Sequence, residues 1–406
     1  MKIQERFIKY AKIDTQSDPK SVCIPSSEKQ KNLGKVLVEE LLAMNLENVH
    51  MDEFGIVYAV LPSNVDKTVE TIGFLAHMDT APDYSGANVQ PQIIENYDGK
   101  DIVLNAEKGI VLRPSEFPSL CDHLHKTLIV GDGTTLLGAD DKAGIAEIME
   151  MLNYFYHHPK EPHGKVAIAF TCDEEVGRGT DHFNVEKFNA HYAYTVDGGD
   201  IAFVNYENFN AARALISVQG SSVHPGDAKG KMINASMLAM EFQALMPNRT
   251  PANTERKEGF IHLHEMKGRC EDAQLEYLLR DHDEGLLQKQ KECILEAVKM
   301  LNERYEKPLV KVEINDEYRN MASLFQDKME IVDDAIYALK QVGVKAKSLA
   351  IRGGTDGARL SFMGLPCPNI GTGGFNFHGK YEYVCVESME LISDVLIQIV
   401  KGKLTK

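Results

Sequence analysis

The sequence has no pair of cysteines spaced as CxxC and no run of 18 or more apolar residues. Its seven cysteines are scattered and odd in number, which is typical of reduced cytosolic thiols and argues against a disulfide framework or a zinc finger. Without a long apolar run, no segment is expected to span a membrane. The first 18 residues lack the apolar core of a signal peptide, and Ile3, Phe7, Ile8 and Ala11 recur at helical spacing. We therefore expect a cytoplasmic protein whose chain begins with an amphipathic helix.

Basic residues are scarce relative to acidic ones: 44 Lys and Arg face 60 Asp and Glu, which gives a formal net charge of −16. This balance disfavours binding to nucleic acid, where cations must replace the phosphate counterions, and it also disfavours an anionic membrane surface. The length of 406 residues predicts two or three domains, and 43% hydrophobic residues suffice for a large core. The composition is compatible with a soluble enzyme that gathers some of its carboxylates around a cation.

Three short apolar runs have the character of buried parallel strands, namely 71–80, 165–175 and 191–199. The segment 144–158 lies between the first two and carries apolar residues at helical spacing. Alternation of strands and helices predicts an α/β domain whose sheet is mostly parallel and has helices on both faces.

The pattern changes at residue 208 and returns to the first type at about 321. Within 208–320 the expected order is βαββαβ, that of a ferredoxin-like module. Its expected elements are a strand over 212–220, a helix over 231–247, a hairpin of 260–268 and 273–283, a helix over 285–306 and a strand over 309–316. After it we expect a helix over 331–343 and a strand over 346–351. We therefore predict a catalytic domain made of 1–207 and 321–406, with 208–320 inserted as a lid domain.

Acidic and imidazole side chains follow each of the three apolar runs: His77 and Asp79, then Glu174 and Glu175, then Asp197. Parallel sheets carry their chemistry at the carboxyl ends of the strands, so these residues are expected to meet there. Two residues apart in an extended strand, His77 and Asp79 face the same way, so Asp79 can orient the imidazole. One glutamate of the adjacent pair can bind a metal while the other stays free as a base.

Two further candidate ligands lie among glycines, Asp140 in GTTLLGADDKAG and His378 in GGFNFHGK. Each small motif alone is common by chance, and an acidic pair is usually a solvated surface. Their joint occurrence at strand ends favours a dinuclear metal site, which needs a carboxylate that bridges two cations about 3.5–4 Å apart.

Longer motifs extend this pattern over nearly the whole chain: HMDT (77–80), GADDKAG (138–144), DEEVGRG (173–179), DGG (197–199), SVHPGDAKGKMINA (222–235), IRGGTDGARLSFMGLPCPN (351–369) and GGFNFHGK (373–380). With these motifs the chain resembles the dinuclear zinc aminopeptidase family that contains peptidase T. That family belongs to the broader group of acetylornithine deacetylase, succinyl-diaminopimelate desuccinylase and glutamate carboxypeptidase.

The resemblance implies two Zn²⁺ per chain and a role for each candidate residue. His77 and Asp197 would hold one zinc, Glu175 and His378 the other, and Asp140 would bridge them. Asp79 would be the partner of His77, and Glu174 the general base that accepts a proton from the attacking water. The family also leads us to expect a cis peptide bond between Asp140 and Asp141.

Four more residues are candidates for binding the substrate. By resemblance, His224 would reach over the metals from the lid domain and hold the oxyanion or substrate; otherwise it is a surface histidine. Arg280, Arg352 and Asn376 are candidates for binding the C-terminal carboxylate of a tripeptide, because guanidinium suits a carboxylate. The alternative for each arginine is a surface salt bridge. Relatives often dimerise through the lid, so a homodimer is also compatible.

The leading hypothesis is a cytosolic zinc aminopeptidase that releases the N-terminal residue of tripeptides. The alternative within the same fold is a deacylase or carboxypeptidase acting on N-acyl amino acids, which would require a blocked amine where the aminopeptidase requires a free one. A non-catalytic metal-binding or scaffold protein is the alternative from another class. Outside the site, we expect His123 and His125 to lie in loops and Cys172 to be buried without a metal role.

Overall fold

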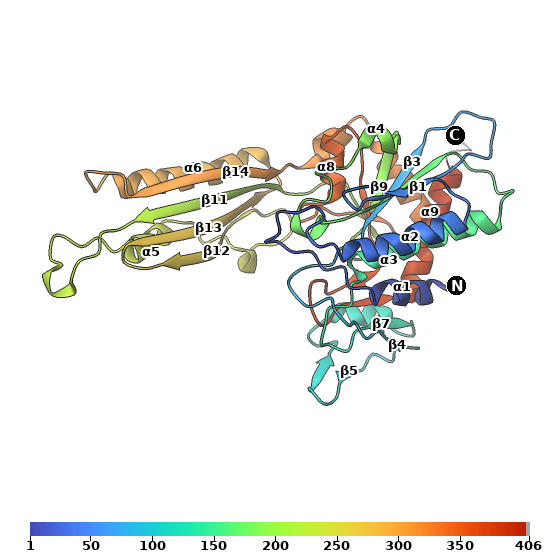
Figure 1. Ribbon diagram of the computed structural model, residues 1–406, viewed down its shortest axis with the longest axis horizontal. Helices are drawn as coiled ribbons and strands as arrows, with labels where there is room; N and C mark the ends of the chain where they lie inside the picture. Colours follow the sequence, from blue (N-terminus) through green and yellow to red (C-terminus); the bar gives the residue numbers. More distant parts are fainter. Residues whose placement is uncertain (403–406) are drawn as a thin grey trace. The chain divides into compact units, whose positions relative to one another are not determined.

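The computed structural model describes residues 1–402, which form two compact units (Figure 1). The first unit consists of 1–206, 324–349 and the chain from 355 onward, and the second of 207–323 and 350–354. The sequence-based expectation places the edges at 207/208 and 320/321 and assigns 350–354 to the first domain. The structure differs there because Ile351 donates its backbone N–H to the carbonyl of Glu207 at 2.8 Å and forms a parallel bridge with Asn208.

The first unit contains most of the regular elements. Its helices are α1 (Ile3–Ala11), α2 (Gln30–Ala43), α3 (Ala139–His157), α4 (Val185–Phe188), α7 (Met329–Gln341), α8 (Asp356–Phe362) and α9 (Val386–Gly402). The strands of its large sheet are β1 (Glu47–Met51), β2 (Val57–Leu61), β3 (Ile72–His77), β8 (Val166–Thr171), β9 (Tyr192–Val196), β10 (Phe203–Asn205), β15 (Lys347–Ser348) and β16 (Asn369–Ile370).

The large sheet has the strand order β1-β2-β8-β3-β9-β16-β10-β15. Its centre is parallel, because β3 pairs in parallel with both β8 and β9, and β9 pairs in parallel with β16. Strands β1 and β2 extend it in antiparallel fashion at one edge. The predicted α/β class with a mostly parallel sheet is confirmed, and the fully buried strands β3, β8 and β9 explain why these segments read as continuous apolar runs.

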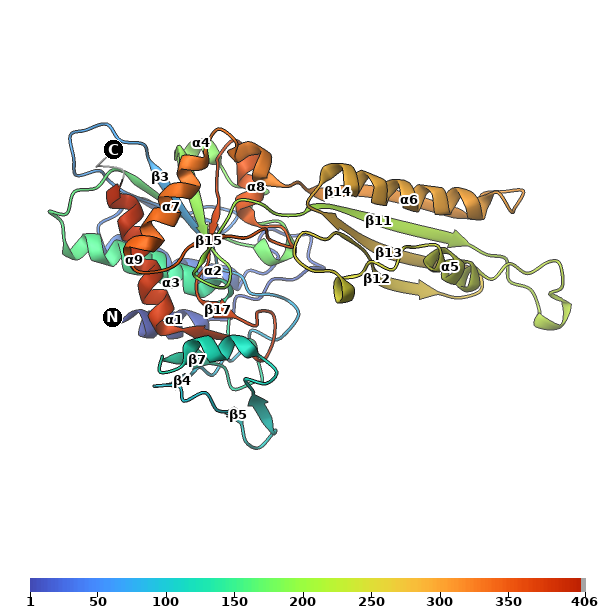
Figure 2. The same ribbon diagram turned by 180° about the vertical axis from the view of Figure 1, so that it is seen from behind.

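Helices cover both faces of this sheet, as predicted. On one face, Phe74 stacks on Tyr194, whose hydroxyl donates to the carbonyl of Ile331 in α7 at 2.6 Å. Helices α3, α7 and α9 pack together on this face, and Figure 2 shows α7 and α9 side by side. The next residue, Leu75, points to the opposite face and joins a buried cluster with Phe188 of α4 and Leu360 of α8.

A second, smaller sheet in the first unit is antiparallel, with the order β17-β18-β7-β4. Its strands are β4 (Gln92–Ile94), β7 (Leu128–Val130), β17 (Gly374–Phe375) and β18 (Tyr383–Cys385), and β5 (Ile102–Asn105) pairs separately with β6 (Ile110–Leu112). The turn between β17 and β18 contains His378, so this small sheet positions one of the candidate ligands.

The second unit is a ferredoxin-like module. Its elements in chain order are β11 (Asn210–Gln219), α5 (Ala235–Ala244), β12 (Phe260–Gly268), β13 (Asp272–Asp281), α6 (Glu284–Asn302) and β14 (Val310–Tyr318). The antiparallel strand order β12-β13-β11-β14 places the first strand beside the last, and the unit has its own apolar core. The predicted order βαββαβ is therefore confirmed.

Two predicted elements are shorter in the structure. Helix α5 begins at Ala235, four residues after the start of the predicted segment, because Asn234 caps it by accepting from the backbone N–H of Met237. The strand expected over 346–351 is reduced to the two residues of β15. Leu349 ends the first unit at this point, and the chain continues into the second unit.

Candidate metal centre

The carboxyl ends of β3, β8 and β9 form one edge of the large sheet, where the candidate residues gather. His77 is the last residue of β3 and lies directly opposite Thr171, the last residue of β8. Glu174 and Glu175 follow in a short 3₁₀ turn, η2 (Glu174–Val176), and Asp197 follows β9 directly. The parallel pairing of the strands is therefore what brings these side chains together.

Two groups of side chains at this edge lie close enough together to hold a metal ion. One group is His77, Asp140 and Asp197, and the other is Asp140, Glu175 and His378; within each group the ligand atoms all lie within 4.8 Å of one another. Asp140 belongs to both groups. Its Oδ1 lies 2.9 Å from Nε2 of His77, and its Oδ2 lies 3.4 Å from Nε2 of His378. The two oxygens of one carboxylate thus face two different histidines.

The ring of His77 is oriented by the backbone. Its Nδ1 lies 3.0 Å from the carbonyl oxygen of Asp79 and 3.4 Å from the Asp79 carboxylate. A hydrogen on Nδ1 donated to that carbonyl leaves Nε2 directed at Asp140. Burial alone lowers the pKa of His77, but hydrogen bonds and negative charge from Asp140 and Asp79 outweigh it and raise this pKa well above its usual value.

The Asp79 carboxylate accepts hydrogen bonds from the acidic turn after β8. Its two oxygens accept from the backbone N–H groups of Glu174 at 3.1 Å and Glu175 at 3.2 Å. The sequence-based expectation assigns Asp79 to the imidazole alone. In the structure, Asp79 also fixes the acidic turn beside the metal groups.

Excess negative charge is concentrated in this centre. Burial and the nearby Asp140 raise the pKa of Glu175 and of Asp197 to about 7 each, and burial raises the pKa of Glu174 well above its usual value. Oε1 of Glu175 is buried and has no hydrogen-bond partner among residues 1–402. Crowded carboxylates with an unsatisfied buried oxygen are suited to cations, which lower such pKa values.

His378 and Asp140 shift each other's pKa in opposite directions. Hydrogen bonds to Asp140 and to Glu175, whose Oε2 lies 3.0 Å away, raise the pKa of His378 to about 11. Burial would raise the pKa of Asp140, but hydrogen bonds from His378 and His77 outweigh burial and hold it well below its usual range. The other ring nitrogen of His378 lies 3.6 Å from the exposed Asp83.

The expected cis peptide bond between Asp140 and Asp141 is present. Asp140 and Asp141 have non-helical backbone angles within the first turn of α3. Oδ2 of Asp141 accepts from the backbone N–H of His77 at 3.1 Å, so the turn that carries Asp140 is tied to the end of β3.

Two further acidic residues contribute to the site and were not singled out from the sequence. Asp173, in the left-handed region at φ +61°, accepts from the backbone N–H of Ser26 and from Nε2 of Gln30, both at 2.7 Å, and so anchors the acidic turn to an N-terminal loop. Asp356 accepts from Oγ1 of Thr171 at 2.9 Å, and burial raises its pKa to about 6. The only sequence signal for Asp356 was its place in the motif 351–369.

Asp356 also lines a small cavity behind the metal groups. The cavity is lined by Leu75, Ala76, His77, Asp141, Thr171, Glu174, Thr195, Asp197 and Asp356. Glu174 therefore lies beside both Asp197 and Asp356, and it belongs to neither group of candidate ligands.

The substrate-binding candidates are distributed over both units. His224 lies in the second unit, where it is exposed and accepts from the backbone N–H of Gly226 at 3.2 Å. Asn376 lies in the first unit at φ +58°, and its Nδ2 donates to the carbonyl of Tyr381 at 3.1 Å, which closes the turn that contains His378.

Both candidate arginines have partners within the second unit. Arg280 is 9% exposed, donates to the carbonyls of Ala212 and Leu279, and pairs with Glu317 at 2.8 Å. Arg352 donates to the carbonyls of Arg256 and Glu258 and to Oγ1 of Thr254, at 2.7, 2.8 and 2.9 Å, respectively. The alternative of a surface salt bridge thus describes neither arginine, because Arg280 is buried and the three bonds of Arg352 go to two backbone carbonyls and a hydroxyl.

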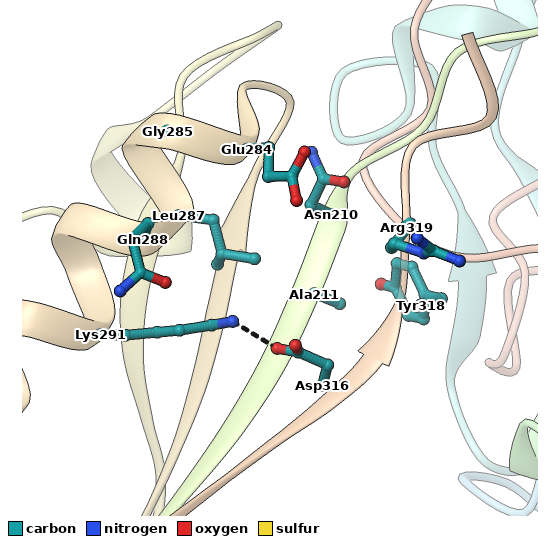
Figure 3. Close-up of a pocket in the computed structure, with 10 residues that line it drawn as sticks. All are labelled: Asn210, Ala211, Glu284, Gly285, Leu287, Gln288, Lys291, Asp316, Tyr318 and Arg319. Atoms are coloured by element: carbon teal, nitrogen blue, oxygen red, sulfur yellow. Dashed lines mark hydrogen bonds and ion pairs between the residues drawn. The ribbon is translucent and has the colours of Figure 1, made fainter. Parts of the chain in front are cut away.

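A separate pocket lies within the second unit, between the first turns of α6 and strands β11 and β14 (Figure 3). Lys291 and Asp316 pair inside it, and Nδ2 of Asn210 donates to the carbonyls of Asp281 and His282. Each of these three side chains already has a partner within the second unit, so they do not indicate a ligand.

Similar proteins support a family assignment. The model of the peptidase family M20/M25/M40 matches residues 135–402. Peptidase T of Geobacillus sp. strain WCH70 is 53% identical over 400 residues, which cover 98% of each chain. Peptidase T of Fusobacterium nucleatum is 52% identical over 400 residues, which cover 98% of this chain and 97% of the relative.

The fold is shared with solved structures. A tripeptidase from Staphylococcus aureus superimposes with a TM-score of 0.79 at 21% sequence identity, covering 100% of this chain and 98% of that one. From the family model and the extent of identity to the relatives, the chain belongs to the peptidase family M20/M25/M40 and, within it, to the peptidase T family.

Proposed function

We propose that this protein is a two-zinc aminopeptidase that releases the N-terminal residue of tripeptides. Its relatives are named peptidase T, and a protein of the same fold is named a tripeptidase. The observation that carries the proposal is the position of Asp140, whose two oxygens face His77 on one side and His378 on the other. A carboxylate shared in this way suits a bridge between two cations.

The residues present fit such a pair of ions. His77 and Asp197 would hold one ion, Glu175 and His378 the other, and Asp140 both. Each group combines one imidazole with carboxylates, a ligand set that Zn²⁺ accepts, although Co²⁺ or Mn²⁺ would also bind it. Bound there, the ions would lower the pKa of a water molecule and polarise the peptide carbonyl.

Glu174 is the proposed general base. Asp79 holds the backbone of Glu174 through a hydrogen bond, and the Glu174 carboxylate stays outside both ligand groups. Burial raises the pKa of Glu174 above the usual value of a glutamate, which suits a group that takes a proton from the attacking water and passes it to the leaving amine.

The remaining candidates are proposed to bind the substrate. His224 would hold the substrate carbonyl or oxyanion, and Arg280, Arg352 and Asn376 would bind the C-terminal carboxylate. A substrate carboxylate at Arg280 would compete with Glu317, which already pairs with that guanidinium. Selection of tripeptides by length requires such a contact, because the enzyme must recognise both the free amine and the C-terminal carboxylate at a fixed distance from each other.

Hydrolysis of a peptide series tests the proposal. The zinc-loaded protein should cleave unblocked tripeptides faster than dipeptides and tetrapeptides, and a chelator should abolish the activity until Zn²⁺ is added back. Release of the N-terminal residue is followed by chromatography of the products. No cleavage of any unblocked tripeptide by protein that holds two metal ions would contradict the proposal and favour a non-catalytic metal-binding protein.

N-acetylated substrates separate the alternative within the same fold. A deacylase or a carboxypeptidase acting on N-acyl amino acids requires the blocked amine, whereas the aminopeptidase should lose its activity when the tripeptide is acetylated.

Location and assembly remain predictions. Within residues 1–402, no helix combines the length and apolar character that a membrane span needs. A cytoplasmic location is expected from the sequence, and a homodimer is compatible with the resemblance; fractionation of cells and sedimentation of the purified protein would test them.

A further inference from the structure

Glu382 is a buried carboxylate that binds segment 137–140, which runs into the first turn of α3, through three hydrogen bonds. It directly precedes β18 and is 1% exposed. Its Oε2 accepts from the backbone N–H groups of Leu137 at 2.7 Å and Gly138 at 2.8 Å, and its Oε1 accepts from that of Asp140 at 3.0 Å. Backbone donors of a buried loop need acceptors, and one carboxylate supplies all three here.

The same turn of the chain carries His378. The backbone N–H of Glu382 donates to the carbonyl of Gly379 at 3.3 Å, and Asn376 donates to the carbonyl of Tyr381. These bonds make 376–382 one compact turn between β17 and β18. Glu382 therefore joins the turn that contains one candidate ligand, His378, to the start of α3, which contains another, Asp140.

Other contacts hold the rest of the centre. Asp141 ties the Asp140 turn to the end of β3, where His77 lies, and Asp197 follows β9 in the same sheet. His378, by contrast, comes from the small antiparallel sheet. Its position relative to Asp140 depends on how that small sheet is joined to the start of α3.

We propose that Glu382 is a positioning residue for the metal site formed by Asp140, Glu175 and His378. It sets the distance between His378 and Asp140 without touching the substrate. This inference rests on the proposed two-metal centre. Removal of the Glu382 carboxylate should weaken the ion held by His378 more than the ion held by His77.

The substitution Glu382→Gln tests this with little change in volume. Glutamine has one acceptor oxygen and a donor NH₂ group, so it cannot accept from all three N–H groups in the same geometry. Calorimetric titration of the metal-free full-length protein with Zn²⁺ measures both binding steps, and titration with Co²⁺ adds the absorption spectrum of each step. In the variant, one ion should bind as in the wild type and the other, assigned to His378, at least tenfold more weakly.

A matched control lies five residues further along the chain. The half-buried Glu387 also accepts a backbone N–H through both oxygens, from Thr127 at 2.9 Å, and these bonds do not involve segment 137–140. Glu387→Gln should bind both ions as the wild type does. With Glu382→Gln, added metal should restore kcat while KM stays unchanged, which a general loss of structure would not produce.

Wild-type affinity for both ions in Glu382→Gln, or equal weakening of both, would overturn the inference. If that variant does not fold, Glu382→Asp retains the charge on a shorter side chain and should still weaken mainly the ion held by His378. If neither variant folds, Glu382 serves the fold and the inference is wrong. Failure of the proposed function is distinct, since a wild-type protein that binds two ions and cleaves no tripeptide leaves the role of Glu382 intact.

Discussion

At the scale of single residues, Asp79 links the two halves of the candidate chemistry. Its carbonyl orients His77, and its carboxylate accepts from the backbone of both Glu174 and Glu175. A substitution at Asp79 would disturb a ligand and the proposed base together. Glu174 itself is the sharper position for a test, because it belongs to neither metal group.

Glu174→Gln should lower kcat by at least about 10²- to 10⁴-fold, the usual contribution of a general base. The glutamine cannot accept the proton of the attacking water. Metal content, measured by elemental analysis, should stay at the wild-type value, because no ligand is removed. A variant that keeps a rate close to that of the wild type would show that another group acts as the base.

Helix α3 also contains a buried carboxyl group, Glu147, that has no role in the proposed chemistry. Glu147 is fully buried, and neither of its oxygens has a hydrogen-bond partner in the described part of the chain. Burial raises its pKa well above the usual value. The folded protein therefore keeps this proton at a pH where the unfolded chain has released it.

This difference predicts a pH-dependent loss of stability. The pKa of this glutamate in the unfolded chain is about 4.3. As the pH rises above that value, Glu147 should lower the free energy of unfolding by up to about 1.4 kcal/mol per pH unit, until the pH exceeds its pKa in the folded protein. Glu147→Gln removes that contribution, so its unfolding temperature should fall less than that of the wild type between pH 5 and pH 8. Glu39→Gln, at an exposed position of α2, should keep the wild-type slope. An unchanged slope in Glu147→Gln would mean that the group ionises in the folded protein.

At the scale of elements, the small antiparallel sheet matters beyond its size because its β17–β18 turn carries His378. Its core includes His123, which the sequence-based expectation places in a loop. His123 instead ends the 3₁₀ turn η1 (Pro118–His123), is buried, and packs against Phe375 and Tyr383 of the two hairpin strands. Cys172 is buried as expected.

Burial lowers the pKa of His123, which predicts an acid-sensitive sheet. Below the usual histidine pKa of about 6.5, the unfolded chain takes up a proton that the folded chain does not, so stability is lost as the pH falls. His123→Phe should lose less thermal stability than the wild type between pH 7 and pH 5. The exposed His157→Gln should behave as the wild type. Equal acid sensitivity in His123→Phe would place the cause in other groups.

At the scale of the whole molecule, the two units have separate cores, and all the candidate metal ligands lie in the first. Metal binding should therefore stabilise one unit by mass action and leave the other unchanged. At metal concentrations a hundredfold above Kd, the expected gain is about 2.7 kcal/mol for each ion bound.

Calorimetry should resolve two unfolding transitions. Chelation should lower one of them by about 5 to 10 °C, the shift expected for a unit of this size, and added Zn²⁺ should restore it. A single transition would show that the units unfold as one, and no shift on chelation would argue against a tightly bound metal.

The amino-acid sequence by itself determined the elements and the class of chemistry. Buried parallel strands were recognisable as continuous apolar runs, and the ferredoxin-like order of strands and helices followed from the change between strand and helix periodicities along 208–320. Residues at the carboxyl ends of parallel strands come together when the sheet forms, so the sequence also indicated which side chains would meet there. The tertiary structure alone decided which distant groups meet: Glu382 on the backbone of Asp140, Asp356 behind Glu174, and Glu317 on Arg280. These contacts join residues that are far apart in the chain. The periodicity of apolar residues and the spacing within a motif describe only neighbouring residues, so they could not predict such contacts.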